Sequence, residues 1–209
     1  MTSALALYSG ALRRDRARLR LLDTAGRALR HLDIGAWHRL RAGDHALLDR
    51  CVGPTLDVGC GPGRLVEALH LAGIPALGID ISPTAVRLAR RRGAYAVSAD
   101  VFGPVPGAGG WRYALLADGN IGIGGDPVRL LRRCAALLSD EGELLVETDP
   151  PGEGGWAGAA VLHDGNRAST PFPWALVDAD QMERHAARAG LTVLQSWNED
   201  GRWFACLAK

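Results

Sequence analysis

Short apolar runs alternate with amphipathic stretches over most of the chain after Gly53. Five of the runs are apolar almost throughout: TLDV, PALGID, AYAVSAD, WRYALLAD and GELLVETD. Between them, RLVEALHLAG, PTAVRLARRRG and PVRLLRRCAALL repeat apolar residues at helical spacing. A strand that helices cover on both faces needs apolar residues throughout. The alternation therefore predicts an α/β fold with a parallel sheet and crossover helices.

Residues at the ends of these stretches agree with that order of elements. Ser82 is an N-cap residue, and Pro83 follows it at the first helical position. Near the C-terminus, Asp178 and Gln181 form a capping box that begins another helix. The runs LTVLQSW and RWFACLA follow, joined by the turn at 198–201, which predicts an antiparallel hairpin at the end of the chain.

The first 50 residues follow a different pattern. Apolar residues between positions 11 and 50 recur at helical spacing among arginines, which predicts a helical segment. This segment, residues 1–50, would form an N-terminal helical lid on a sheet domain over residues 51–209. The start of the chain carries its apolar stretch before its charges, the reverse of a secretory signal, and no run is long enough to span a membrane. We therefore expect a cytoplasmic protein that does not bind membranes.

Composition and charge narrow the class of partner. The chain has 209 residues, 24 of them Lys or Arg and 23 Asp or Glu, and the formal net charge of +1 gives no field that would attract nucleic acid. The four cysteines are far apart and have no histidine at ligand spacing, so neither a metal site nor a disulfide framework is expected. We expect a small-molecule substrate, no nucleic-acid partner, and a monomer or homodimer.

A glycine-rich turn joins the first strand of the predicted sheet to the first crossover helix. Gly59, Gly61 and Gly63 lie where open α/β sheets bind ligands, and glycine lets the backbone approach a ligand closely. Arg64 stands where the dinucleotide fingerprint has its third glycine, and no Gly-Lys-Ser/Thr follows, so neither that fingerprint nor a P-loop is matched. A turn that merely closes a tight connection is the alternative.

Acidic residues stand at the ends of three predicted strands. Asp57 precedes the glycines, Asp80 ends the second strand about 20 residues on, where it can take both hydroxyls of a ribose, and Asp100 ends the third. The combination of DVGCGPG, GIDIS and SAD resembles the class I S-adenosylmethionine-dependent methyltransferases, in the D/E-x-G-x-G-x-G form of their first motif. The resemblance runs from about Gly53 to the C-terminus.

This resemblance implies a cofactor, a fold and a set of contacts. The cofactor is S-adenosylmethionine, and the fold is a Rossmann-like, mostly parallel seven-stranded sheet with its last strand antiparallel. Family members hold the methionine moiety on the glycine turn, the ribose on the acid of the second strand, and the adenine beside residues that follow the second and third strands. Here those positions are Gly59, Cys60, Gly61 and Gly63, then Asp80, then Ile81, Asp100 and Val101. Asp57 would support the loop or the cofactor's amino group.

The resemblance also points to the end of the fourth strand. In small-molecule methyltransferases this strand end faces the methyl group, which makes Asp118 a candidate cofactor contact and catalytic residue, and Asn120 a candidate substrate contact. Hydrogen bonds within a turn are the alternative for both. Asp149-Pro150-Pro151 is interpreted as a rigid loop on the rim, because Gly152 replaces the aromatic residue of the amino-methyltransferase box and the segment follows the fifth strand.

Histidines and tryptophans supply the remaining candidates. His163 and His38 are candidate catalytic bases, with surface or packing histidines as the alternative. Trp37, Trp156 and Trp174 would form aromatic walls for a flat or apolar substrate, or would pack the lid onto the sheet.

The expected function is methyl transfer from S-adenosylmethionine to a small-molecule nucleophile, with oxygen or nitrogen favoured over carbon or sulfur. One alternative is a non-catalytic binding module that keeps the fold and the glycine turn. Another is a nicotinamide-dependent oxidoreductase. Arg64 disfavours it, as does the absence of a Tyr-x-x-x-Lys pair, since Lys209 is the only lysine.

Overall fold

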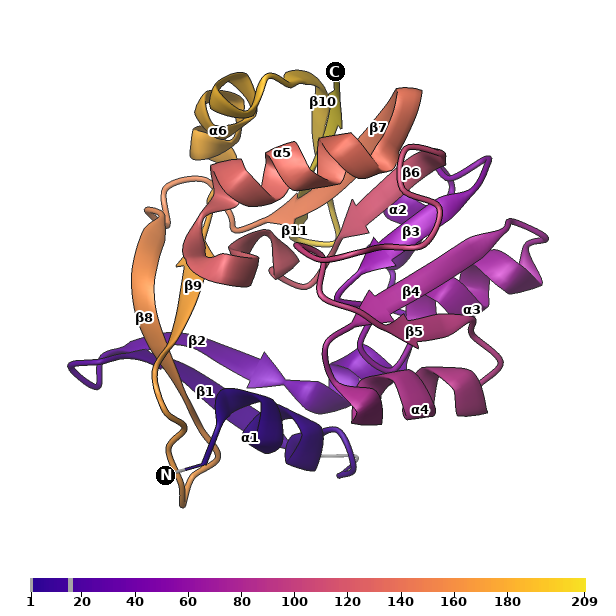
Figure 1. Ribbon diagram of the computed structural model, residues 1–209. Helices are drawn as coiled ribbons and strands as arrows, with labels where there is room; N and C mark the ends of the chain where they lie inside the picture. Colours follow the sequence, from indigo (N-terminus) through magenta and orange to yellow (C-terminus); the bar gives the residue numbers. More distant parts are fainter. Residues whose placement is uncertain (1, 15–16) are drawn as a thin grey trace.

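A seven-stranded sheet forms the centre of the protein, in the order β10-β11-β7-β6-β3-β4-β5 (Figure 1). The computed structural model describes residues 2–14 and 17–209. The strands are β3 (Thr55–Val58), β4 (Ala76–Asp80), β5 (Ala96–Ser98), β6 (Trp111–Leu116), β7 (Leu138–Thr148), β10 (Thr192–Glu199) and β11 (Arg202–Ala208). β3 to β7 pair in parallel, whereas β11 is antiparallel to both β7 and β10. The predicted sheet and its reversed last strand are confirmed.

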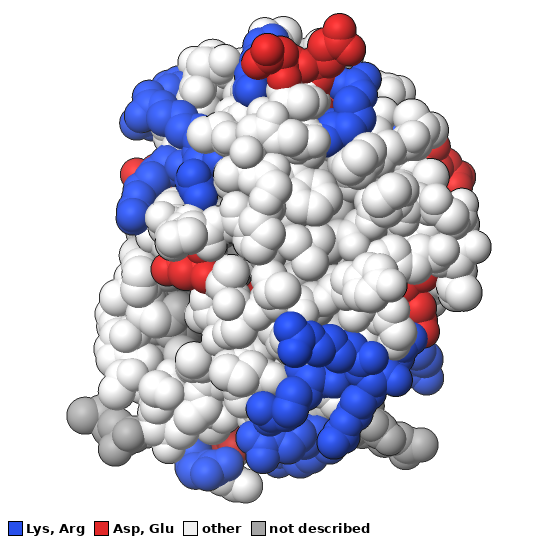
Figure 2. All heavy atoms as spheres, turned by 45° about the vertical axis from the view of Figure 1, so that its right-hand side comes forward, with Lys and Arg blue, Asp and Glu red and all other residues white. Residues whose placement is uncertain are grey.

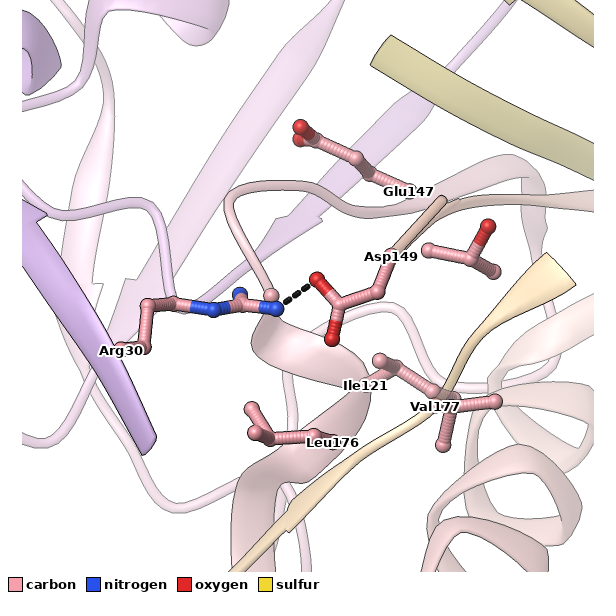
Figure 3. Close-up of a pocket in the computed structure, with 8 residues that line it drawn as sticks. Arg30, Ile121, Glu147, Asp149, Leu176 and Val177 are labelled. Atoms are coloured by element: carbon pink, nitrogen blue, oxygen red, sulfur yellow. Dashed lines mark ion pairs between the residues drawn. The ribbon is translucent and has the colours of Figure 1, made fainter. Parts of the chain in front are cut away.

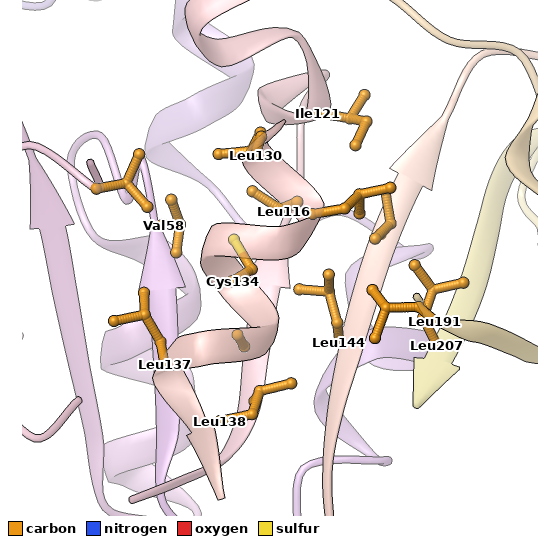
Figure 4. Packing of buried hydrophobic residues seen from close by; sticks show 14 of the residues in the cluster. Val58, Leu116, Ile121, Leu130, Cys134, Leu137, Leu138, Leu144, Leu191 and Leu207 are labelled. Atoms are coloured by element: carbon orange, nitrogen blue, oxygen red, sulfur yellow. The ribbon is translucent and has the colours of Figure 1, made fainter. Parts of the chain in front are cut away.

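Helices cover both faces of this sheet. They are α2 (Asp44–Leu48), α3 (Arg64–Leu71), α4 (Pro83–Arg91), α5 (Pro127–Leu137) and α6 (Met182–Ala189), with short 3-10 turns η1 (Ile34–His38), η2 (Asn120–Gly125) and η3 (Ala179–Gln181). One core cluster joins α5 and α6 to the sheet, and a second joins α2, α3 and α4 to it. Figure 4 shows Cys134 and Leu137 of α5 packed near Leu144 of β7 and Leu116 of β6.

The predicted caps and the final hairpin are present. The Ser82 side chain accepts a hydrogen bond from the Ala85 backbone at 3.3 Å, and the Asp178 side chain accepts one from the Gln181 backbone at 3.1 Å. β10 and β11 are joined by Asp200 and Gly201, both at positive φ (52° and 73°). Two consecutive residues of this kind form the tight turn whose twist matches an antiparallel hairpin.

A second, four-stranded antiparallel sheet has the order β2-β1-β8-β9. Its strands are β1 (Arg18–Asp23), β2 (Ala28–Asp33), β8 (Trp156–His163) and β9 (Phe172–Leu176), and α1 (Ala4–Ala11) packs against it. Figure 1 shows this sheet beside the main one, with α1 below it. Its two hairpins come from opposite halves of the sequence, so a boundary at residue 50 does not divide this small sheet from the rest of the chain.

The helical expectation for residues 11–50 is wrong for most of that range. The helix α1 ends at Ala11, and a hairpin occupies residues 18–33. Leu19 and Leu21 are two positions apart and both buried, and β1 pairs with β8, where Leu21 lies opposite Leu162. The leucines of this segment are also compatible with helical spacing. The segment forms a strand because it pairs with β8, about 140 residues away in the sequence.

Charged side chains are unevenly spread over the surface. In Figure 2, Lys and Arg gather on the lower part and at the upper left of the visible face, and a broad, mostly uncharged area lies between them. Arg87, Arg90 and Arg91 of α4 are exposed. Within the described ranges, no helix is long and apolar enough to cross a bilayer.

Candidate active site

A cavity of about 400 Å³ separates the carboxyl ends of the parallel strands from α1 and the small sheet. It brings together residues that are far apart in sequence, including most of the predicted site. The predicted residues on its wall are Trp37, Gly59, Cys60, Gly61, Asp80, Ile81, Asp100, Val101, Asp118, Asn120 and Trp174. Volumes of this order are typical of small-molecule sites.

The glycine turn needs its glycines for conformation and for space. Gly59, Gly61 and Gly63 have φ of 75°, 53° and 81°, a region that side chains disfavour. A Cβ at Gly63 would lie 2.6 Å from the Cβ of Ala89 on α4, and one at Gly59 would lie 2.7 Å from the Asn120 amide nitrogen. Gly63 is outside the cavity wall and serves the packing of α3 on α4. The backbone around Gly61 is open to the cavity.

Cys60 has a packing role within this turn. A Cβ at Gly78 of β4 would lie 2.6 Å from its sulfur, so the side chain fills the space that this glycine leaves. Burial raises the pKa of the Cys60 thiol well above its ordinary value. The thiol is therefore protonated at neutral pH, as expected for a small packing residue.

Asp80 connects three elements at the end of β4. One carboxylate oxygen accepts a hydrogen bond from the Ser82 backbone at 2.7 Å, and the other accepts from the Gly61 backbone at 3.0 Å and from the Tyr8 hydroxyl at 3.1 Å. The side chain is buried, and this burial raises its pKa. Tyr8 reaches Asp80 from α1, 72 positions away in the sequence, so sequence spacing gave no signal for it.

The predicted adenine end has apolar walls. Ile81 is 56% exposed and Val101 is buried, and both line the cavity together with Phe102. The Asp100 carboxylate accepts a hydrogen bond from the Phe102 backbone at 2.9 Å, which fixes the turn after β5. The Arg129 guanidinium lies over the Phe102 ring, 4.1 Å from its centroid. These contacts hold Phe102 at the cavity wall.

Asp118 lies at the end of β6 in a strained conformation, with φ of 56°. One of its carboxylate oxygens pairs with Arg64 at 2.5 Å, and the other pairs with Arg41. Its backbone N–H donates to Glu147 of β7 at 2.6 Å. Strain of this kind is held by surrounding contacts and is common at functional sites. Asn120, two residues on, donates to the Val58 carbonyl at 2.9 Å and so ties this loop to β3.

A buried ionic network supports Asp118 from behind. Asp44 of α2 is fully buried, and it accepts two hydrogen bonds from Arg64, at 2.8 and 2.9 Å, and one from Arg202 at 2.7 Å. Arg202 also donates to Glu147 at 2.9 and 2.7 Å. Burial alone would raise the pKa of Asp44, but the Arg64 and Arg202 hydrogen bonds outweigh it and the pKa is lowered. The network joins α2 to the strand ends.

Asp57 lies beneath the glycine turn and outside the cavity wall. It is 2% exposed, and burial raises its pKa to about 7, with the charge of Arg64 opposing the shift. In the described part of the chain, the Asp57 carboxylate has no ion-pair partner within 4 Å, in contrast to Asp44. Its position suits support of the loop.

The other end of the cavity is apolar and aromatic. Leu21 and Leu32 of the first hairpin face Phe172 and Trp174 of the second, and Trp37 completes the wall. The rings of Phe172 and Trp174 meet edge to face, with centroids 6.0 Å apart. Edge-to-face contacts of this kind stabilise aromatic walls.

Besides Gly63 and Asp57, three further predicted residues lie away from the cavity. Leu162 faces the cavity, and since neighbouring strand residues point to opposite faces, His163 points away from it, toward Arg20, 3.2 Å from His163 Nδ1. Trp156, the first residue of β8, is half-buried and packs against the core cluster that α1 shares with the small sheet. His38 also lies outside the wall, and its carbonyl accepts from Arg92 at 2.9 Å. Neither histidine lines the cavity.

The acids of the cavity wall are already engaged. Asp80 accepts three hydrogen bonds, Asp118 pairs with two arginines, and Asp100 accepts from the backbone. Among the described residues that line the cavity there is no histidine and no lysine. The wall therefore offers binding and orientation more readily than proton abstraction.

Comparisons with known proteins agree with this geometry. Residues 55–142 match the family model described as a methyltransferase domain. A comparison with curated proteins found no match. Among solved structures, a S-adenosylmethionine-dependent methyltransferase from Bacteroides fragilis, in complex with S-adenosyl-L-homocysteine, has a TM-score of 0.75 and 22% identity over 98% of this chain and 93% of its own.

Two further structures share the fold. The 1,6-didemethyltoxoflavin-N1-methyltransferase from Burkholderia thailandensis has a TM-score of 0.58 and 20% identity over 79% of this chain and 74% of its own. The O-methyltransferase NcsB1 from neocarzinostatin biosynthesis has a TM-score of 0.56 and 24% identity over 75% of this chain and 49% of its own. The chain thus carries a methyltransferase domain over residues 55–142, and its strand order and glycine turn are those of the class I S-adenosylmethionine-dependent methyltransferase fold.

Proposed function

We propose that this methyltransferase acts on an oxygen or nitrogen nucleophile of a small, apolar and flat molecule. The observation that carries the proposal is the single cavity that runs from the glycine turn to the aromatic wall of the small sheet. A cavity open to both cofactor and acceptor is what direct transfer between them requires.

The residues present fit S-adenosylmethionine. The turn at Gly59 and Gly61 leaves backbone accessible to the methionine part, because a Cβ at Gly61 would point into the cavity toward the Tyr8 hydroxyl, at 3.5 Å. Asp80 would hold the ribose hydroxyls, and Ile81 and Val101 would flank the adenine. When bound, the cofactor supplies a methyl group on a positively charged sulfur.

Tyr8 changes how Asp80 receives the ribose. A carboxylate has about four acceptor positions, and Asp80 uses three of them for Ser82, Gly61 and Tyr8. Binding both ribose hydroxyls therefore requires the Tyr8 hydroxyl to leave Asp80. Because Tyr8 belongs to α1, we propose that cofactor binding shifts this helix relative to β4.

Trp37, Phe172 and Trp174 would bind the acceptor. Asn120 would lie where the cofactor end and the aromatic end of the cavity meet. NcsB1 was solved with 1,4-dihydroxy-2-naphthoic acid, and the Burkholderia enzyme with 1,6-didemethyltoxoflavin. Those molecules support the choice of a flat acceptor for a cavity with aromatic walls. The residues of this chain would act by holding the nucleophile in line and excluding water.

Calorimetry with S-adenosylhomocysteine, and separately with NAD, tests the proposed cofactor site. We expect S-adenosylhomocysteine to bind, the Asp80→Ala variant to lose that binding, and the Asp140→Ala variant to keep it, because Asp140 is an exposed acid outside the cavity. Unchanged binding in Asp80→Ala would show that the ribose lies elsewhere. Binding of NAD alone would overturn the assignment.

A further inference from the structure

Arg30 is a charged residue on an otherwise apolar wall. It lies on β2 opposite Leu21 of β1, and Leu32 follows two positions later on the same face. All three line the cavity, together with Phe172 and Trp174. A guanidinium among such neighbours loses hydration, and this burial lowers the pKa of Arg30. Removing a charged guanidinium from water costs free energy, so a buried arginine normally has an ion-pair partner or binds a ligand.

The Arg30 head group is held at the end of β6. It forms an ion pair with Asp149, directly after β7, and Figure 3 shows the two side chains reaching toward one another between the small sheet and the main sheet. Gly119 has no side chain where the guanidinium passes, since a Cβ there would collide with Nη1 of Arg30. The charge is therefore fixed beside the 118–120 loop, between the glycine turn and the aromatic wall.

Arg30 has more N–H donors than its ion pair with Asp149 uses. A guanidinium has five N–H donors, and within the described ranges Asp149 is its one ion-pair partner within 4 Å. Arg64 differs, because Asp44 and Asp118 engage all three of its nitrogens. On its other side Arg30 borders a polar pocket of about 30 Å³, lined also by Glu147 and Thr148, which is large enough for water.

The acceptor is restricted because the described residues of the wall include no histidine or lysine that could remove its proton. An alcohol of ordinary acidity needs a base to remove its proton, and the wall acids are engaged as described above. A fixed positive charge beside the acceptor disfavours a protonated amine and favours an oxyanion. The acceptor most suited to this wall is one whose hydroxyl ionises readily by itself.

We propose that the acceptor is an apolar ring compound with an acidic hydroxyl group, of the phenol or enol class, and that Arg30 binds its oxyanion. This inference rests on the proposed function. The O–H bond breaks with the proton passing to bulk water, and the oxygen keeps the electron pair. That pair forms the bond to the methyl carbon while the carbon–sulfur bond breaks toward sulfur. Arg30 thereby replaces a general base with electrostatic stabilisation of the ionised nucleophile.

The test uses 4-nitrophenol, whose ionised form absorbs visibly, and nitrobenzene as its neutral counterpart. Both are titrated into protein saturated with S-adenosylhomocysteine, with binding followed by tryptophan fluorescence, since Trp37 and Trp174 line the cavity. The absorbance of the bound phenolate is then recorded against pH. We expect the bound phenol to ionise about one pH unit lower than in free solution, the lower end of the range for a carboxyl group beside arginine, because Asp149 shares the charge.

Variants assign the effect to Arg30. Arg30→Met keeps the length of the side chain and should abolish the shift while leaving nitrobenzene binding intact; Arg30→Lys should keep part of the shift. Asp149→Asn should enlarge the shift, because the competing carboxylate is gone. Cooperative thermal unfolding identifies variants that are folded.

Three results would count against the proposal in different ways. A bound phenol that ionises at its solution pH, or a shift that persists in Arg30→Met, overturns the role of Arg30 and leaves the proposed function standing. Failure of both probes to bind wild-type protein that does bind S-adenosylhomocysteine overturns the aromatic acceptor site itself, and with it this inference.

Discussion

Asp57→Asn should stabilise the protein, and more so at higher pH. Asp57 is 2% exposed, and burial raises its pKa from 3.8 to about 7. A carboxyl group with a raised folded-state pKa binds more protons in the folded state than in the unfolded state between those two pH values. The free energy of unfolding therefore falls as pH rises from about 4 to about 7.

The magnitude follows from the size of the shift. Each pKa unit corresponds to about 1.4 kcal/mol, so ionising Asp57 costs the folded protein about 4 kcal/mol once the pH exceeds 7. About 2 kcal/mol of this cost develops between pH 5 and pH 7. Asparagine has nearly the same shape and does not ionise, so the variant should be free of this pH-dependent cost.

Urea unfolding of wild type and Asp57→Asn at pH 5 and pH 8 measures the difference. We expect the variant's advantage in unfolding free energy to grow by about 3 kcal/mol between the two pH values. An advantage that does not change with pH, or a variant less stable than wild type at pH 8, would refute the reasoning. The rest of the chain is the same in both proteins, so its pH dependence cancels in the comparison.

Asp44→Asn is the matched control, because Asp44 is equally buried but paired with Arg64 and Arg202. Its pKa is lowered, so its contribution to stability is present above the unfolded pKa and is lost as pH falls through the folded pKa. At pH 7 the substitution should lower the unfolding free energy by about 3 kcal/mol, since it leaves buried arginine charge uncompensated. A stabilising effect would contradict the difference drawn between the two acids.

Two other substitutions test the packing of the glycine turn and the role of Tyr8 beside Asp80. Gly63→Ala should lower the unfolding free energy by at least about 1 kcal/mol, measured by thermal or urea unfolding, because φ is 81° and the new Cβ would lie 2.6 Å from that of Ala89; wild-type stability would show that the turn relaxes freely. Tyr8→Phe should tighten S-adenosylhomocysteine binding roughly fivefold in calorimetry, about 1 kcal/mol, because the hydroxyl no longer competes for Asp80. Weaker binding would show that the hydroxyl remains at the cofactor.

Local patterns determined the main sheet. Each strand-helix unit is contiguous in sequence, and its apolar runs, caps and glycines act on neighbouring residues. Because parallel strands all end at one edge, the positions of Gly61, Asp80, Asp100 and Asp118 near one cavity were predictable from the order of elements alone.

Only the tertiary structure determines how the small sheet forms and which residues line the aromatic end of the cavity. β1 is a strand because β8 offers it a partner about 140 residues away, although its leucines also fit helical spacing. Strand alternation turned His163 outward and Leu162 inward, which the composition of that segment could not indicate. Sequence patterns indicated no role for Arg30 or Tyr8. Their contacts with Asp149 and Asp80 exist only where distant segments meet, and there hydrogen-bonding geometry and burial decide what a residue does.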